Sequence, residues 1–149
     1  MNRKALFSGT FDPYTIGHYA LIKRALYFID EIIIAIGVNS EKKTFYSLEE
    51  RINNIKLIYK DEPKVKVMHY NTLTVDFAKQ QNAGFILRGI RNINDFEYEK
   101  NISDINRKLS DIETLFMFSE PEYSHVSSSL VRELIHYNKD ISNLIPIIT

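Results

Sequence analysis

The sequence of 149 residues contains no cysteine and carries no net charge. The absence of cysteine excludes a disulfide framework, catalysis by a thiol and a cysteine-ligated zinc site. Lys plus Arg (19) equals Asp plus Glu (19), so no global field favours nucleic acid or an acidic membrane surface. Any anion must therefore be bound by a local arrangement of cations and backbone amides.

Long apolar runs and linkers are also missing. No stretch approaches the ~18 apolar residues that a membrane span needs. The N-terminus MNRKALFSGTFDP is basic, but Gly9, Asp12 and Pro13 interrupt it too early for a signal peptide. Low-complexity segments and internal repeats are not evident either. We therefore expect one domain over residues 1–149, located in the cytoplasm, with neither nucleic acid nor membrane as a partner.

Short apolar segments alternate with segments of helical periodicity. The expected strands are 4–7, 31–38, 64–69, 85–87 and 114–118, and the expected helices are 17–29, 47–59, 73–81, 95–109 and 128–137. The continuous run IIIAI is typical of a strand that is covered on both faces. The segment SLEE predicts a capping box of Ser47 and Glu50 at the start of the second helix. The alternation predicts βαβ crossovers and an α/β fold with a doubly wound parallel sheet. In such a sheet ligands bind beyond the carboxyl ends of the strands, so the five loops that follow the strands are the candidate site.

The first loop reads GTFDPYTIGH. Gly9 lets the backbone approach a ligand closely, and Thr10 offers a hydroxyl and an amide at the same point. Thr15 and His18 share the first turn of the following helix, whose free N–H groups suit a phosphate. His18 adds a donor that strengthens as charge builds on a transferring phosphoryl group. The alternative is a plain strand–turn–helix with a capping threonine and a surface histidine.

Three further loops carry cations or free amides. Lys42 follows the second strand and can neutralise phosphate, although a Lys-Lys pair in a loop is usually only solvated. Free amides near Leu73 and Thr74 could bind an uncharged, amide-bearing arm, and the alternative is an ordinary helix start. Arg88 and Arg91 offer fork-shaped donors for phosphate oxygens at the end of the fourth strand. The consecutive serines 127–129 predict a second phosphate nest, or otherwise an N-cap with spare serines.

These motifs together resemble a known family. GTFDPYTIGH and VSSSLVR are similar to the two signatures of the T/HxGH nucleotidyltransferases. The stretches NSEKKTFYSLEER and RGIRNINDFEYE resemble the phosphopantetheine adenylyltransferases within that superfamily. The resemblance spans nearly the whole chain and implies a Rossmann-like sheet of five strands in the order 3-2-1-4-5. It selects Lys42 over Lys43 as the active-site cation and leaves Glu50 and Arg51 structural.

The resemblance also implies the roles of individual residues. It assigns catalysis to His18, Thr10, Lys42 and Arg91. It implies ATP binding by Gly9, Thr10, Phe11, Gly17, His18, Gly89, Arg91, Glu99, Tyr123, Ser127, Ser128 and Ser129, with Glu99 near the ribose and Tyr123 near the adenine. It implies binding of 4′-phosphopantetheine by Thr10, Lys42, Leu73, Thr74, Arg88, Tyr98, Ile102 and Asn106.

The implied reaction transfers AMP from ATP to 4′-phosphopantetheine and releases dephospho-CoA and pyrophosphate. Because the attacking phosphate has a second pKa of about 6, it is mostly dianionic at pH 7 and needs no general base. Mg²⁺ is expected to travel with ATP rather than in a protein cage. A homohexamer and feedback binding of CoA are further implications. The alternatives are another T/HxGH transferase, such as a cytidylyltransferase, and a non-catalytic nucleotide-binding module.

Overall fold

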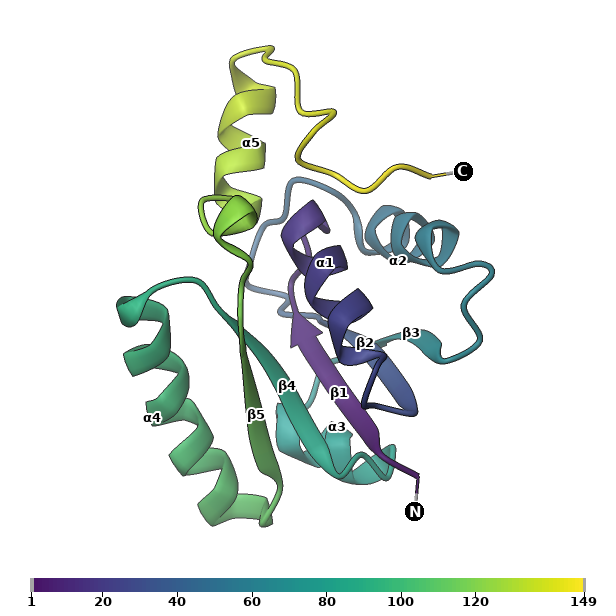
Figure 1. Ribbon diagram of the computed structural model, residues 1–149, viewed down its shortest axis with the longest axis vertical. Coiled ribbons are helices and arrows are strands. Elements are labelled where there is room, and N and C mark those ends of the chain that lie inside the picture. The colour runs from purple at the N-terminus through teal and green to yellow at the C-terminus, as the bar shows by residue number, and fades with distance from the viewer. Residues whose placement is uncertain (1, 149) are drawn as a thin grey trace.

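A computed structural model describes residues 2–148 as an alternation of strands and helices (Figure 1). The strands are β1 (Lys4–Gly9), β2 (Glu31–Gly37), β3 (Val65–Tyr70), β4 (Phe85–Ile90) and β5 (Glu113–Phe118). The helices are α1 (Ile16–Ala25), α2 (Leu48–Ile58), α3 (Thr74–Gln80), α4 (Ile93–Ser110) and α5 (Ser128–His136), with a 3-10 turn, η1, at Pro121–Tyr123. The α/β class predicted from the sequence is confirmed.

The five strands form one parallel sheet in the order β3-β2-β1-β4-β5. The chain winds outward from β1 to β3, then returns to place β4 on the other side of β1. This reversal confirms the doubly wound sheet and puts the topological switch point between β1 and β4. The carboxyl ends of β1 and β4 and the loops that follow them, which together carry GTFDP and RGIR, therefore lie side by side at this edge.

The middle of the sheet is buried on both faces, which explains the unbroken run IIIAI. Ile32, Ile34 and Ile36 pack with α1 and α2, while Ile33 and Ala35 pack with α3 on the opposite face. All five side chains are fully buried. Burying two apolar faces within one strand anchors β2 firmly, so the loops beyond its end start from a rigid point.

The helix starts are fixed by side-chain caps. Ser47 and Glu50 form the capping box expected at α2. Helix α4 begins at Ile93, two residues earlier than expected, because Asn92 caps it by accepting a hydrogen bond from the Asp95 amide. Helix α1 ends at Ala25, four residues earlier than expected, and residues 26–28 form a turn. The other boundaries differ by smaller amounts, and β4 extends three residues further than expected.

The segment after α5 turns back across the molecule and ends near α2 (Figure 1). Its Leu144 carbonyl accepts a hydrogen bond of 2.8 Å from the amide of Ile16, the first residue of α1. The C-terminal segment thereby satisfies one of the free amides at a helix start that faces the site. Between residues 2 and 148, no helix combines the length and apolar character that a bilayer crossing requires.

Candidate active site

Two cavities open at the carboxyl edge of the sheet, where the five predicted loops meet. The larger has a volume of about 660 Å³ and lies over the start of α1 and α5. The smaller has a volume of about 420 Å³ and lies between α3 and α4. The two substrates of a group transfer need adjoining sites, and this edge provides them.

The larger cavity collects every residue that was predicted to bind ATP. Its wall also includes the cations Lys42, Arg88 and Arg132 and the carboxylates Asp12 and Asp95. The predicted residues found on its wall are Gly9, Thr10, Phe11, Gly17, His18, Gly89, Arg91, Glu99, Tyr123, Ser127, Ser128 and Ser129.

The smaller cavity collects all but one of the residues that were predicted to bind 4′-phosphopantetheine. Those found on its wall are Thr10, Lys42, Leu73, Thr74, Arg88, Ile102 and Asn106. The exception is Tyr98, whose side chain is 67% exposed and does not line either cavity of this single chain. Tyr98 precedes Glu99 by one residue, a rotation of about 100° around the helix, whereas Glu99, Ile102 and Asn106 share one face. The contact of Tyr98 with 4′-phosphopantetheine therefore stays a prediction.

One short wall belongs to both cavities. It consists of Ser8, Gly9, Thr10, Lys42, Arg88 and Glu99. A phosphate in the smaller cavity and a phosphate chain in the larger would therefore meet across these residues. Two of the shared side chains are cationic, so the wall suits the charge that gathers between two reacting phosphates.

His18 is held in one tautomer at the start of α1. Its Nδ1 accepts a hydrogen bond of 2.9 Å from the amide of Thr15, and the Thr15 hydroxyl caps the His18 amide in return. Nδ1 therefore carries no proton, and Nε2–H is the free donor. Burial among aromatic rings, reinforced by the charges of Arg88 and Arg91, lowers the pKa of His18 to about 3. The imidazole is thus a neutral hydrogen-bond donor at physiological pH.

Thr10 is positioned from two sides. Arg51, nearly fully buried on α2, donates a hydrogen bond of 2.8 Å to the Thr10 carbonyl, which confirms a structural role for Arg51. The Thr10 hydroxyl accepts a hydrogen bond of 3.2 Å from Nζ of Lys42. At Gly9 a Cβ would lie 3.0 Å from the ring of Phe11, so any larger residue would press on this ring at the end of the strand. The expected cation and hydroxyl are thus brought together by the fold.

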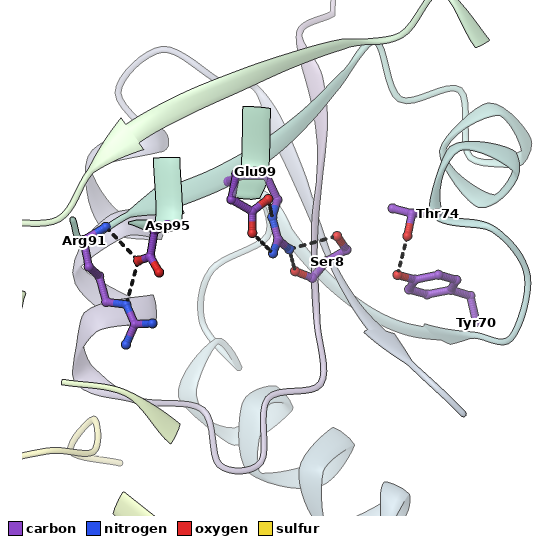
Figure 2. A network of polar contacts seen from close by, with 7 residues as sticks. Ser8, Tyr70, Thr74, Arg91, Asp95 and Glu99 are labelled. Atoms are coloured by element: carbon purple, nitrogen blue, oxygen red, sulfur yellow. Dashed lines mark hydrogen bonds and ion pairs between the residues drawn. The ribbon is translucent and has the colours of Figure 1, made fainter. Parts of the chain in front are cut away.

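Arg88 and Glu99 form a two-pronged ion pair in the shared wall (Figure 2). Nε and Nη2 of Arg88 donate to the two oxygens of Glu99 at 2.8 and 2.6 Å. Nη1 donates to the carbonyl of Ser8 from the other side. Glu99 is 8% exposed, and its two oxygens face Arg88, so an additional contact to the ribose would use their remaining lone pairs. The pairing with Arg88 was not anticipated, and the ribose contact stays a prediction.

Arg91 lies at the mouth of the larger cavity and is tethered to the start of α4. Its Nε donates to Oδ2 of Asp95 at 3.0 Å, and its amide donates to the same oxygen. Nη1 and Nη2 of Arg91 are not part of this tether (Figure 2). A half-exposed guanidinium held by one edge can still present its other edge to phosphate oxygens.

The three serines at α5 have separate partners. Ser127 caps the helix by accepting from the amide of Leu130, and Ser128 donates to the carbonyl of Pro13 at 2.8 Å. Ser129 accepts from Nη2 of Arg132. All three line the larger cavity, but these hydroxyls already make contacts within the protein. The helix N–H groups are therefore the better candidates for phosphate donors, and the nest stays a prediction.

Asp12 and Arg132 were missed as parts of the site. The buried carboxylate of Asp12 accepts hydrogen bonds from the amides of Phe45 and Tyr46, at 2.7 and 2.8 Å, and so binds the loop that carries Lys42. Nη1 of Arg132 donates to the Asp12 carbonyl at 2.8 Å. Both residues belong to the quoted motifs, so their fixed places within GTFDP and VSSSLVR were the available signal. Across residues 2–148, no group of three or more His, Asp or Glu side chains is arranged to hold a metal ion.

Comparison with known proteins agrees with this geometry. The family model described as cytidylyltransferase-like matches residues 6–134. The phosphopantetheine adenylyltransferase of Bacteroides thetaiotaomicron is 60% identical, over 97% of this chain and 95% of that protein. Those of Bacteroides fragilis and Flavobacterium johnsoniae are 57% and 54% identical, each over 97% of this chain and over 96% and 95% of their own lengths. This chain therefore belongs to the phosphopantetheine adenylyltransferases, within the cytidylyltransferase-like family.

Proposed function

We propose that this protein transfers the adenylyl group of ATP to 4′-phosphopantetheine, the penultimate step of coenzyme A synthesis. The observation that carries the proposal is the shared wall, since the larger and the smaller cavity meet there at Thr10, Lys42 and Arg88. Relatives that are 50–60% identical over nearly their whole length bear the name of this activity.

In the proposed reaction a phosphate oxygen of 4′-phosphopantetheine attacks the α-phosphorus of ATP. A new P–O bond forms, the bond from the α-phosphorus to the bridging oxygen breaks, and pyrophosphate leaves with that oxygen. The attacking phosphate is mostly dianionic at pH 7, because its second pKa is about 6, so no base has to remove a proton. Catalysis then consists of alignment and of stabilising the charge on the transferring group.

Each cation has a part in this scheme. Nε2–H of His18 donates to an oxygen of the α-phosphate, and Lys42 with Thr10 lies between the two substrates. Arg88 binds the phosphate of phosphopantetheine, and Arg91 binds the phosphates that leave as pyrophosphate. Mg²⁺ is proposed to arrive with ATP, keeping most of its water ligands, and to neutralise the leaving group.

The proposal extends to the setting of the enzyme. We expect it in the cytoplasm, where ATP and phosphopantetheine are made, and we expect CoA to compete for the smaller cavity. A homohexamer is proposed as well, supported by apolar side chains that α4 exposes in the single chain. These are Ile93, Tyr98, Ile105 and Leu109, each more than half exposed.

The first test is release of pyrophosphate from ATP and Mg²⁺ in the presence of 4′-phosphopantetheine. Parallel reactions offer nicotinate mononucleotide with ATP, and glycerol 3-phosphate with CTP. Release of pyrophosphate only in the reaction that contains phosphopantetheine and ATP supports the proposal. Release only in another pairing would keep the chemistry of His18 but refute the role given to Arg88. No release in any pairing, with ATP still bound, would indicate a non-catalytic nucleotide-binding module.

A further inference from the structure

The imidazole of His18 lies in a box of aromatic rings. The ring of Tyr14 is stacked on it, with the centroids 5.1 Å apart and the planes at 27°. Phe11 and Phe7 meet it edge-on, at 5.1 and 6.0 Å. The Thr15 amide and hydroxyl hold Nδ1 by hydrogen bonds of 2.9 and 3.1 Å. The hydrogen bond fixes one atom of the ring, and the box of rings determines how far the ring can swing about that atom.

Tyr14 is itself anchored on a second helix. Its hydroxyl shares a hydrogen bond of 2.7 Å with the hydroxyl of Tyr59, the C-cap of α2. Tyr14 is 4% exposed and Tyr59 is 8% exposed, and their rings meet edge-on at 6.1 Å. Burial raises the pKa of both phenols, so the pair stays protonated. The same helix places Arg51 on the Thr10 carbonyl, so α2 supports the first motif at two points.

We propose that Tyr14 is a positioning residue, whose ring holds the His18 imidazole so that Nε2–H points at the transferring phosphate. This inference rests on the proposed adenylyl transfer. The ring face of Tyr14 is the part that acts on His18, because the face contacts the imidazole whereas the hydroxyl is hydrogen-bonded to Tyr59. Offset stacking of two rings is a directional contact, and a donor in a catalytic site loses much of its effect when it is slightly misplaced.

The test compares Tyr14→Leu, which removes the ring, with Tyr14→Phe, which keeps it. We expect Tyr14→Leu to lower kcat by about tenfold, with the KM for both substrates little changed. The reason is that the variant loses one aromatic contact, whose free energy corresponds to a rate change of about this size. Tyr14→Phe should keep most of kcat. Equal losses in the two variants would refute the ring as the acting part, and a Tyr14→Leu enzyme with the kcat of the wild type would refute the proposal.

Tyr59→Phe is the matched control. It breaks the same hydroxyl pair from the other side, so it and Tyr14→Phe should each lower the melting temperature while kcat stays close to that of the wild type. The double variant Tyr14→Phe/Tyr59→Phe leaves no unpaired hydroxyl and should regain much of the lost stability. Loss of kcat in Tyr59→Phe would show that general loosening of the fold, rather than the ring contact, controls His18.

A double-mutant cycle with His18→Ala separates positioning from a purely structural effect. If Tyr14 acts through His18, Tyr14→Leu should lower kcat much less in the His18→Ala background than in the wild type. If Tyr14→Leu lowers kcat by the same factor in both backgrounds, the proposal is refuted. A second readout does not depend on activity: in Tyr14→Leu the NMR titration of His18 should move up from a pKa of about 3, since less aromatic surface then covers the imidazole. An unchanged titration would likewise contradict the role of the ring. Where Tyr14→Leu fails to fold, Tyr14→Met gives the same comparison with a longer and more flexible side chain. Wild-type protein that releases no pyrophosphate would refute the proposed function instead, and the titration would still test the contact.

Discussion

The guanidinium of Arg88 and the carboxylate of Glu99 face each other with two parallel hydrogen bonds, at 2.8 and 2.6 Å, in the wall between the two cavities. The Glu99 side chain is 10% exposed and that of Arg88 is 29% exposed. Glu99 therefore acts as an internal counter-ion that fixes the plane of Arg88. Nη1 of Arg88 donates to both the carbonyl and the hydroxyl of Ser8, while Nε and Nη2 each donate to Glu99. The second N–H of Nη2 is therefore the donor that these contacts leave for a substrate phosphate.

Glu99→Gln tests this relationship. The variant keeps the shape of the side chain but leaves Arg88 without its carboxylate, so we expect the free protein to lose roughly 2 kcal/mol of unfolding free energy, less than for a fully buried pair. Phosphopantetheine brings a phosphate to Arg88 and should restore part of the loss. The rise in melting temperature that phosphopantetheine produces should therefore be larger in the variant than in the wild type.

Glu97→Gln is the control, because Glu97 is an exposed acid on the same helix. It should change neither the melting temperature nor the shift produced by phosphopantetheine. If Glu99→Gln instead weakens the binding of ATP and leaves that of phosphopantetheine unchanged, Glu99 contacts the ribose, as the sequence suggested. Its pairing with Arg88 is then secondary.

His18→Ala should lower kcat about a hundredfold while ATP affinity stays nearly intact, because a donor aimed at the transition state contributes ~3 kcal/mol. The measurement is steady-state pyrophosphate release together with calorimetric titration of ATP. His125→Ala provides the control, since His125 is exposed and does not line either cavity. A His18→Ala enzyme that retains most of its kcat would refute the catalytic role.

The lowered pKa of His18 predicts how stability depends on pH. In the unfolded chain His18 takes up a proton near pH 6.5, but in the folded chain only near pH 3. As the pH falls below 6.5, the unfolded state therefore binds the proton first, and the free energy of unfolding decreases. Carboxylates with a lowered pKa, such as Asp30 at about 2, affect the free energy of unfolding at lower pH. The interval from pH 6.5 to 5 therefore reports the contribution of His18. Urea unfolding at pH 6.5 and at pH 5 should show a smaller loss of unfolding free energy between the two in His18→Gln than in the wild type.

Much of this fold was predictable because local signals agreed with one another. The run IIIAI, the alternation of strands and helices, and Ser47 with Glu50 each predicted a feature that the structure confirms. Boundaries were less predictable where a cap or a turn decides them. Asn92 starts α4 before the first apolar repeat, and the turn at residues 26–28 ends α1 while its apolar pattern continues.

The site was predictable at the level of loops but not of partners. The resemblance named Arg88, Glu99 and Lys42 as ligand contacts, because each belongs to a recognisable motif. It could not reveal that Arg88 pairs with Glu99, since that contact depends on how α4 packs beside β4. The stacking of Tyr14 on His18 likewise depends on the tertiary structure, because Tyr14 is anchored by Tyr59, 45 residues further along the chain.

Asp12→Asn tests the link between the first motif and the loop that carries Lys42. The amides of Phe45 and Tyr46 donate to different oxygens of Asp12, so the NH₂ group of asparagine would face one of these two N–H donors. Leaving a buried donor unpaired should cost about 2 kcal/mol of stability. As the loop loosens, Lys42 moves away from Thr10, and the KM for phosphopantetheine should rise about tenfold. Glu41→Gln in the same loop, on an exposed side chain, should leave both values unchanged.

The exposed apolar face of α4 leads to the last prediction, which concerns assembly. Ile105 and Leu109 are each 58% exposed and lie four residues apart, on one face of the helix. A contiguous apolar face of this kind marks an interface, so we expect Ile105→Glu with Leu109→Glu to reduce the mass measured by light scattering to that of smaller species. Tyr27→Glu is the control, because Tyr27 is 87% exposed beyond the end of α1. If the wild type is a monomer in solution, or if only Tyr27→Glu dissociates the assembly, α4 is not the interface. If Tyr98 completes the phosphopantetheine cavity only in the assembly, the dissociated double variant should also show a raised KM for phosphopantetheine, with the KM for ATP unchanged.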